Sequence, residues 1–264
     1  MIKWFGRILS CVSSNSEATI EMEHINTQPG VINVLLFTHG MVQYNTRTCR
    51  GKLTAEVLCT WAAKKCGIPR LFSNLFCLYN KKLETWFAPA RVIAPSENHF
   101  VFRLRFHTST DLTALEERVV AYMFEQYRYD FHHDRMQGLS TEEALGLMVL
   151  DLVRYGREKQ IALNQVCEHI RFRNYLPMSL ATNLTYVDRV KLKRKVQRSL
   201  ETFQEDHREA ITFKVMFMVS LMEERRRWGA EEFETVNGDK YSISAAKGIQ
   251  KYSLDTQVNL MSFI

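Results

Sequence analysis

The strongest constraint on the fold of this chain is a change of residue pattern near position 107. Between residues 31 and 106, short apolar or alternating segments follow one another, with a single helical stretch among them. From about residue 113 to 228, apolar residues recur every three or four positions, which is typical of amphipathic helices. Alternation returns from residue 230. This order predicts an α+β protein built from three separate parts.

The first part, residues 31–107, is predicted to be a ubiquitin-like β-grasp lobe. Its expected helix begins after Thr54, a good N-cap residue, and ends at Gly67 and Pro69. Strands are expected on both sides of this helix, at 31–37, 41–48, 75–80, 84–88 and 99–106. Two strands, one crossing helix and further strands form the β-grasp order.

The second part, residues 108–229, is predicted to be a four-helix lobe. The long helices are expected at 113–131, 144–159, 187–206 and 209–228. Ser140 and Glu143 have the spacing of a capping box, in which each side chain bonds the other's backbone. The helix that they open is apolar around most of its circumference, so it should lie at the centre of the lobe.

The two ends of the chain carry weaker signals. Residues 230–264 alternate apolar and polar positions, and Asn237-Gly238 suits a hairpin turn. This tail is too short for a complete sheet domain, so a partial β lobe is predicted. Residues 1–30 are expected to be an N-terminal extension. They lack the apolar run of a signal peptide, and nothing in the chain approaches a membrane-spanning length.

No catalytic or metal-binding motif stands out. The sequence contains no glycine-rich phosphate loop, no nucleophile elbow, no zinc-protease motif and no kinase motif. Its six cysteines form no C-x-x-C pair and are expected to be reduced thiols, mostly buried. The "HHD" string at His132–Asp134 is interpreted as a polar loop. The chain is therefore predicted to be non-catalytic and to hold neither a metal nor a cofactor.

The charge balance favours a negatively charged partner. The formal net charge is +6, yet acidic residues are interleaved almost everywhere, so nucleic acid is not expected. Six Lys or Arg residues lie among the ten positions from Arg189 to Arg198. On a helical wheel the apolar residues of this segment form one stripe: Leu192, Val196, Leu200 and Phe203. The basic residues fan over the remaining surface: Lys191, Lys193, Arg194, Lys195 and Arg198.

Two interpretations of this basic face remain open. In the first, it is the solvated back of a helix that packs against the core, and this explains the spacing fully. In the second, the concentrated positive charge attracts an acidic segment or an anionic lipid surface.

Several strings, in the same order along the chain, resemble a FERM domain and in particular that of the Janus kinases. "LTAEVLCTWAAKKCGIPRLFSNLFCLYN" (53–80) and "FRLRF" (102–106) resemble the first FERM lobe. "YMFEQYRYDF" (122–131), "EALGLMVLDLVR" (143–154) and "IRFRNYLP" (170–177) resemble the second. The resemblance implies a ubiquitin-like lobe, an acyl-CoA-binding-protein-like helical lobe and a truncated PH-like β lobe, here residues 230–264.

The chain also departs from the family pattern. The third lobe is cut short, and the kinase-bearing parts of the family are absent from the sequence. The chain thus resembles a fragment, a truncated isoform or a divergent relative, and kinase activity is not carried over to it.

The resemblance implies docking onto the membrane-proximal segment of a cytokine receptor's cytoplasmic tail, in JAK-STAT-type signalling. The matching positions for peptide contact are Leu147, Val149, Leu150, Tyr186, Arg189 and Phe203. Core packing is the alternative role for the apolar ones, so at most half of them are expected to touch a partner. Asp188 and Ser199 differ from the residues usual in the family, which bears on peptide specificity.

Two alternative functions remain open. A cytoskeletal-type FERM module would bind phosphoinositide membranes, and the short third lobe argues against it. The chain could also be the N-terminal piece of a non-receptor tyrosine kinase. In the preferred hypothesis the protein is cytoplasmic and peripheral to the membrane through its receptor, with anionic lipid as a further partner.

Overall fold

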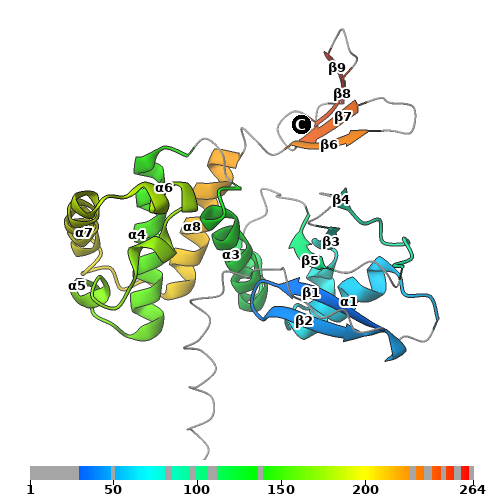
Figure 1. Cartoon of the computed structure of the whole chain (residues 1–264), viewed down its shortest axis with the longest axis horizontal. Coiled ribbons are helices and arrows are strands. Elements are labelled where there is room, and N and C mark those ends of the chain that lie inside the picture. Colours follow the sequence, from blue (N-terminus) through cyan, green and yellow to red (C-terminus); the bar gives the residue numbers. More distant parts are fainter. Residues whose placement is uncertain are drawn as a thin grey trace, which may run out of the picture.

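The computed structural model of the chain describes ten stretches: residues 30–48, 51–80, 85–94, 99–105, 112–135, 139–225, 230–234, 240–244, 248–252 and 257–261. Figure 1 shows a small sheet with a crossing helix, a group of longer helices and a second sheet. This arrangement confirms the predicted α+β class. The extension predicted before residue 30 lies outside the described residues.

The first sheet has the topology of a ubiquitin-like lobe. Its strands are β1 (Val31–Leu36), β2 (Gly40–Asn45), β3 (Phe76–Asn80), β4 (Thr85–Trp86) and β5 (Phe100–Leu104). Their order is β2-β1-β5-β3-β4, in which β1 and β5 run parallel and the other neighbours antiparallel. The crossing helix α1 (Ala55–Lys65) packs against β3, and the short α2 (Arg70–Ser73) follows it. The predicted β-grasp order is therefore confirmed.

The ends of α1 form as the sequence predicts. The Thr54 hydroxyl accepts a hydrogen bond from the backbone N–H of Val57 at 3.4 Å, so Thr54 is the N-cap. After Cys66, Gly67 takes a positive φ of 68°, a conformation that costs a glycine little. Most of β1 is buried, which explains why its sequence is nearly continuous apolar rather than alternating.

The helical lobe contains four long helices, as predicted. They are α3 (Glu117–His132), α4 (Thr141–Lys159), α7 (Tyr186–Glu201) and α8 (Ala210–Arg225). Shorter turns complete it: η3 (Leu112–Ala114), α5 (Leu163–Val166), η4 (Phe172–Tyr175) and α6 (Met178–Asn183). Helix α4 packs against both α7 and α8, and α3 packs against α8, so α4 is central as expected (Figure 1).

Several helix boundaries differ from the prediction, and α4 already starts at Thr141 rather than at residue 144. Helix α3 starts at Glu117, because the 3-10 turn η3 occupies the positions before it. Helix α7 ends at Glu201 rather than near residue 206, and a turn follows it. The guanidinium of Arg157 donates to the backbone carbonyls of Phe203 and Asp206, which fixes this turn against α4. The capping box of Ser140 and Glu143 forms as predicted.

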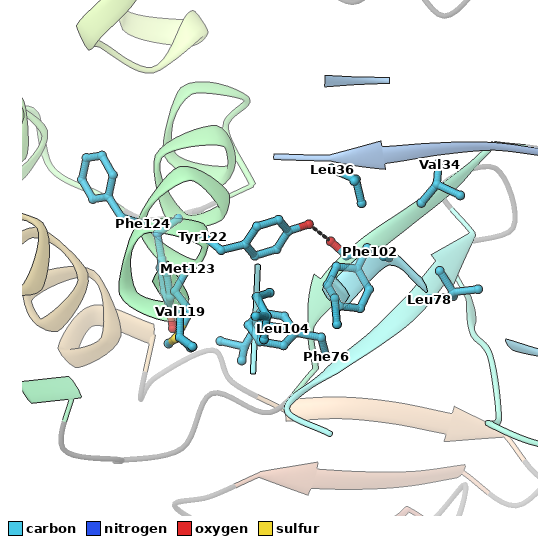
Figure 2. Close-up of a cluster of buried hydrophobic side chains, with 14 of the residues drawn as sticks. Val34, Leu36, Phe76, Leu78, Phe102, Leu104, Val119, Tyr122, Met123 and Phe124 are labelled. Carbon is cyan, nitrogen blue, oxygen red and sulfur yellow. Dashed lines mark hydrogen bonds between the residues drawn. The ribbon is translucent and has the colours of Figure 1, made fainter. Parts of the chain in front are cut away.

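The two lobes share one core and are joined by hydrogen bonds between α3 and β5. The Tyr122 hydroxyl of α3 donates to the carbonyl of Phe102 at 2.7 Å (Figure 2). One turn further along α3, the side-chain oxygen of Gln126 accepts from the backbone N–H of Leu104 at 2.7 Å. Both side chains are fully buried. Figure 2 shows the apolar residues packed around this junction, among them Leu36, Phe76, Leu78, Val119 and Met123.

The second sheet is formed by the tail. Its strands β6 (Ala230–Glu234), β7 (Lys240–Ser244), β8 (Gly248–Tyr252) and β9 (Gln257–Met261) pair antiparallel in chain order. The pairing of β6 with β7 confirms the predicted hairpin, although its turn at Asn237-Gly238 lies outside the described residues.

Candidate functional site

The candidate interaction surface is centred on α7, whose start is fixed by a capping box that the sequence prediction missed. The Thr185 hydroxyl accepts from the backbone N–H of Asp188, and the Asp188 carboxylate accepts from the backbone N–H of Thr185, both at 3.2 Å. The Thr185 hydroxyl also donates to this carboxylate at 2.6 Å. These bonds, with the nearby charge of Lys191, hold the pKa of Asp188 below its usual value.

The inward stripe of α7 packs into the lobe as its spacing predicts. Leu192, Val196 and Leu200 are buried in one cluster with residues of α4 and α5. Phe203 continues the stripe beyond the helix end, where it is partly buried and meets the ring of Phe213 edge-on at 5.9 Å. This stripe therefore attaches α7 to the lobe.

The five residues predicted to form the basic face of α7 lie in three different environments. Lys195 is paired with Glu142 of α4, with its Nζ 2.6 Å from both carboxylate oxygens. Lys193 is half-buried beside α5, where its charge acts on the Cys167 thiol. Lys191, Arg194 and Arg198 are exposed, and within the described part of the chain no ion pair joins them to a carboxylate.

The six residues proposed for peptide contact do not share one accessible surface. Leu147 and Val149 are only 3% and 6% exposed, because α4 is enclosed by its neighbours, so they serve the core. Leu150 and Phe203 are partly buried. Tyr186 is 79% exposed. Arg189 is also exposed, and its guanidinium donates to the carbonyl of Leu184 at 3.3 Å.

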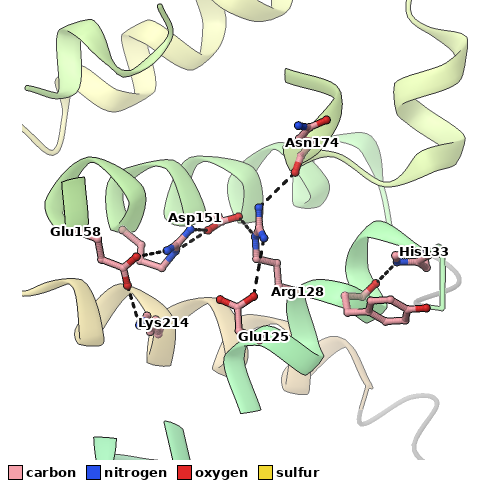
Figure 3. Close-up of polar contacts among 9 residues, drawn as sticks. Glu125, Arg128, His133, Asp151, Glu158, Asn174 and Lys214 are labelled. Atoms are coloured by element: carbon pink, nitrogen blue, oxygen red, sulfur yellow. Dashed lines mark hydrogen bonds and ion pairs between the residues drawn. The ribbon is translucent and has the colours of Figure 1, made fainter. Parts of the chain in front are cut away.

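Behind this surface lies a buried charge network, which sequence reasoning also missed (Figure 3). Asp151 of α4 accepts from Arg128 of α3 at 2.7 Å and from Arg154, one turn further along α4, at 2.7 Å. Arg154 also forms an ion pair with Glu158, and Glu158 in turn pairs with Lys214 of α8 at 2.7 Å. The network thus connects three of the four long helices.

The protonation of Asp151 follows from its two arginine partners. Burial alone raises the pKa of this carboxyl group, but the charges and hydrogen bonds of Arg128 and Arg154 outweigh burial and bring the pKa to about 2. The same pairing raises the pKa of both guanidinium groups. Asp151 therefore stays ionised, as a structural charge inside the lobe.

The "HHD" string is not a simple polar loop. His132 ends α3, and its Nδ1 lies 3.1 Å from the carbonyl of Leu176. Burial, with the nearby charge of Arg128, lowers the pKa of His132 to about 4. Asp134 accepts from the backbone N–H and the hydroxyl of Ser179, at 2.8 and 2.6 Å, and so joins this end of α3 to α6. Among the described residues, no group of three or more His, Cys, Asp or Glu side chains is arranged to hold a metal ion.

The cysteines within the described ranges carry free thiols. Cys167 is buried, whereas Cys59, Cys66 and Cys77 are half-buried rather than mostly buried as predicted. Burial raises the pKa of Cys59 to about 12 and that of Cys66 to about 11, so both stay protonated near neutral pH. Cys11 and Cys49 lie outside the described residues.

None of the described helices combines the length and the apolar character needed to cross a membrane.

Comparison with protein families identifies two adjoining domains. The FERM F1 ubiquitin-like domain matches residues 32–121, and the FERM F2 acyl-CoA binding protein-like domain matches residues 112–222. Both are non-catalytic domains, and no kinase domain is evident among the matches. Together the two matches span most of the chain.

Curated relatives include two tyrosine kinases. Tyrosine-protein kinase JAK3 of Rattus norvegicus is 29% identical over 218 residues, covering 72% of this chain and 19% of the relative. Tyrosine-protein kinase JAK1 of Danio rerio is 23% identical over 239 residues, covering 70% of this chain and 20% of the relative. The chain thus spans about a fifth of the length of the curated relatives it matches.

Solved structures share the fold at low sequence identity. The FERM domain of Drosophila Merlin, in complex with its C-terminal domain, has a TM-score of 0.58 at 13% identity. The match covers 88% of this chain and 79% of the Merlin chain. The Dictyostelium discoideum myosin VII MyTH4-FERM MF2 domain has a TM-score of 0.57 at 13% identity. The match covers 89% of this chain and 50% of the myosin chain. With the observed topology and the two domain matches, these findings show that the chain belongs to the FERM domain family, with a FERM domain similar to that of the Janus kinases.

Proposed function

We propose that this chain is a docking module for the membrane-proximal segment of a cytokine receptor's cytoplasmic tail, acting in JAK-STAT-type signalling. The observation that carries the proposal is the similarity to JAK3 and JAK1 across both FERM domains. A FERM module of this kind is a protein-interaction unit. The proposed localisation is cytoplasmic and peripheral, at the inner face of the membrane, where the receptor binds the protein.

The peptide surface that we propose lies at the start and side of α7. Tyr186 offers an exposed aromatic ring and a hydroxyl group, both of which suit peptide recognition. Arg189 is held by the Leu184 carbonyl through two of its N–H groups, so its remaining N–H donors stay available for peptide carbonyls. Leu150 and Phe203 contribute the parts of their side chains that the core leaves accessible. Leu147 and Val149 support this surface from inside the lobe.

The alternative functions receive less support. The Merlin and myosin structures are 12–13% identical to this chain, so they establish the fold and do not favour a cytoskeletal role. The tyrosine kinase relatives are about five times as long as the matched region, and their catalytic activity is not assigned to this chain. We therefore retain peptide docking as the proposed function.

The test measures, by fluorescence anisotropy in solution, how the purified chain binds a panel of membrane-proximal cytokine-receptor peptides. We expect saturable binding to at least one peptide. Tyr186→Ala and Arg189→Ala should each weaken it about tenfold, since an interface anchor commonly contributes more than 1 kcal/mol. Both side chains are exposed, so these variants should keep the circular dichroism spectrum of the parent chain.

The matched controls are Leu71→Ala and Arg70→Ala on α2 of the first lobe, which also remove an exposed apolar and an exposed basic side chain. They should leave peptide affinity unchanged. Absence of binding to every peptide by the folded parent chain, or equal losses in the control variants, would contradict the proposal.

A further inference from the structure

One side of α7 faces away from the lobe and carries both exposed apolar and unpaired basic residues. At 100° per residue, five of them fall within about 100° of arc. We call this the outer face of α7. It consists of Val187, Val190, Lys191, Arg194 and Arg198, and it ends at the exposed Glu201, the last residue of the helix. It lies opposite the buried stripe that includes Leu192 and Val196.

The apolar residues gather at the N-terminal end of this outer face. Val187 is 58% exposed and Val190 is 36% exposed, and the strongly exposed Tyr186 lies on their flank. The capping box of Thr185 and Asp188 fixes this first turn, so the valines sit on ordered helix. Lys191, Arg194 and Arg198 then continue the outer face toward its C-terminal end.

The charge of this surface is positive, and few carboxylates among the described residues compensate it. Helix α7 contains six Lys or Arg residues against two carboxylates, Asp188 and Glu201. The Asp188 carboxylate is held by the hydroxyl and backbone N–H of Thr185. Glu142 of α4 neutralises Lys195, which lies on the side of the helix rather than on the outer face. The outer face therefore carries three cations against one carboxylate, that of Glu201, and a negatively charged partner is its complementary surface.

The shape of this surface decides between an acidic peptide and a lipid surface. Helix α7 lies at the edge of the lobe, at the far left of Figure 1, and is attached through its inward stripe to α4 and α5. A single helix at an edge is convex and suits a plane. A row of apolar residues beside Lys and Arg is also the pattern of helices that lie in a membrane interface.

We propose that the outer face of α7 docks on an anionic membrane surface. Val187 and Val190 enter the headgroup region, with the Tyr186 ring at its boundary, while Lys191, Arg194 and Arg198 contact the negatively charged headgroups. This goes beyond peptide docking, which we assign to Tyr186, Arg189, Leu150 and Phe203. The peptide surface and the outer face are separate except near Tyr186, where the receptor segment and the membrane from which it emerges would meet.

The test is sedimentation of the full chain with vesicles, without any receptor peptide. Phosphatidylcholine vesicles containing phosphatidylserine should bind the chain, and pure phosphatidylcholine vesicles should bind it far less. The triple variant Lys191→Gln/Arg194→Gln/Arg198→Gln should lower the partition coefficient on the order of 100-fold, from about 1 kcal/mol for each basic residue. Added salt should weaken the binding of the parent chain, because the attraction is electrostatic.

A matched triple variant controls for net charge. Lys64→Gln/Lys65→Gln/Arg70→Gln removes the same charge from exposed positions of the first lobe and should change the partition coefficient less than threefold. Val187→Ser/Val190→Ser should weaken vesicle binding several-fold while preserving all charges and the circular dichroism spectrum.

Three outcomes would overturn this inference: equal binding to both kinds of vesicle, equal losses in the two triple variants, or binding of an acidic peptide in place of vesicles. Peptide affinity measured without lipid is a separate readout. The outer-face triple variant should retain it, so failure of membrane docking and failure of receptor docking can be told apart.

Discussion

Arg103 of β5 and Asp130 of α3 form a buried ion pair across the junction of the two FERM lobes. One terminal nitrogen of the Arg103 guanidinium donates to both carboxylate oxygens of Asp130, at 2.9 and 2.6 Å. The same guanidinium lies over the rings of Phe37 and Tyr79. Asp130 follows Tyr122 and Gln126 at four-residue spacing, so side chains from three successive turns of α3 bond to β5. Their partners are Arg103, Phe102 and Leu104, respectively. We infer that the two lobes unfold as one unit.

The first prediction concerns Asp130→Asn. This change leaves the Arg103 charge buried without its partner, and removing one member of a buried pair typically costs about 3–5 kcal/mol. The free energy of unfolding from urea denaturation should fall by this amount. A single transition should be seen whether fluorescence or circular dichroism is followed.

The control for this prediction is Glu142→Gln, which breaks the exposed pair with Lys195. An exposed pair contributes about 0–1 kcal/mol, so the free energy of unfolding should barely change. The double variant Arg103→Met/Asp130→Leu should recover part of the loss, because it buries no unpaired charge. Equal stability of Asp130→Asn and Glu142→Gln would show that the inter-lobe pair is not buried in solution.

The second prediction uses the pKa of Asp151, which is lowered from 3.8 to about 2. The unfolded chain takes up this proton first as the pH falls, so the ionised carboxylate stabilises the fold above about pH 4. That contribution, about 2 kcal/mol, is lost as the pH falls from about 4 to about 2. Urea midpoints measured across this range should decline accordingly.

Asp151→Asn is the matched variant for the acidic range. It should be less stable than the parent chain at neutral pH, because Arg128 and Arg154 lose their shared partner. The gap in the free energy of unfolding should narrow once the pH falls below about 4. A gap that stays constant down to pH 2 would show that Asp151 does not titrate with the lowered pKa.

The third prediction concerns His132, whose pKa is lowered from 6.5 to about 4 by burial and by Arg128. The unfolded chain binds a proton at this residue before the folded chain does. Stability should therefore fall as the pH drops from about 6.5 to about 4, by about 3 kcal/mol in total. This window lies above that of Asp151, so the two effects separate on the pH axis.

The variant that tests this is His132→Asn, which keeps a donor near the position of Nδ1 for the Leu176 carbonyl but cannot be protonated. It should flatten the decline in unfolding free energy between pH 6.5 and 4. His39→Asn, in the exposed turn after β1, serves as the control and should leave the decline in place. If both variants behave alike, the decline has another origin.

Local signals in the sequence predicted much of this fold. The spacing of Leu192, Val196 and Leu200 identified the buried side of α7, and the Ser140–Glu143 pair identified the start of α4. Both rest on residues within one or two turns of each other, where periodicity and capping chemistry suffice. The FERM order of the lobes followed from the succession of such elements together with the family resemblance.

Long-range contacts could not be predicted in this way. Arg103 and Asp130 are 27 positions apart, and a charged residue in sequence looks the same whether it is solvated or buried. Helix α4 is apolar on most sides, so its pattern could not show that Leu147 and Val149 face the core. The pairing of Lys195 with Glu142, 53 positions away, likewise appears only when the helices are packed.

The last prediction contrasts two glycines of α4, Gly156 and Gly146. A Cβ atom on Gly156 would lie 2.9 Å from a methyl carbon of Leu163 and 3.0 Å from one of Val166, both in α5. Gly156→Ala should therefore lower the free energy of unfolding by about 1–3 kcal/mol, the usual cost of overpacking. Gly146 is exposed, and a Cβ atom on it would have nothing within 4 Å. Gly146→Ala should therefore raise the free energy of unfolding by about 1 kcal/mol, because alanine has the higher helix propensity.

The two substitutions also test the proposed functions, because α5 packs against both α4 and α7. Displacing α5 should shift α7, and with it both the peptide surface and the outer face. Gly156→Ala is therefore expected to weaken peptide and vesicle binding together, while Gly146→Ala preserves both. Urea denaturation and the two binding assays on the same pair of variants provide the measurement. Stabilisation by both substitutions would show that α4 and α5 do not approach each other this closely.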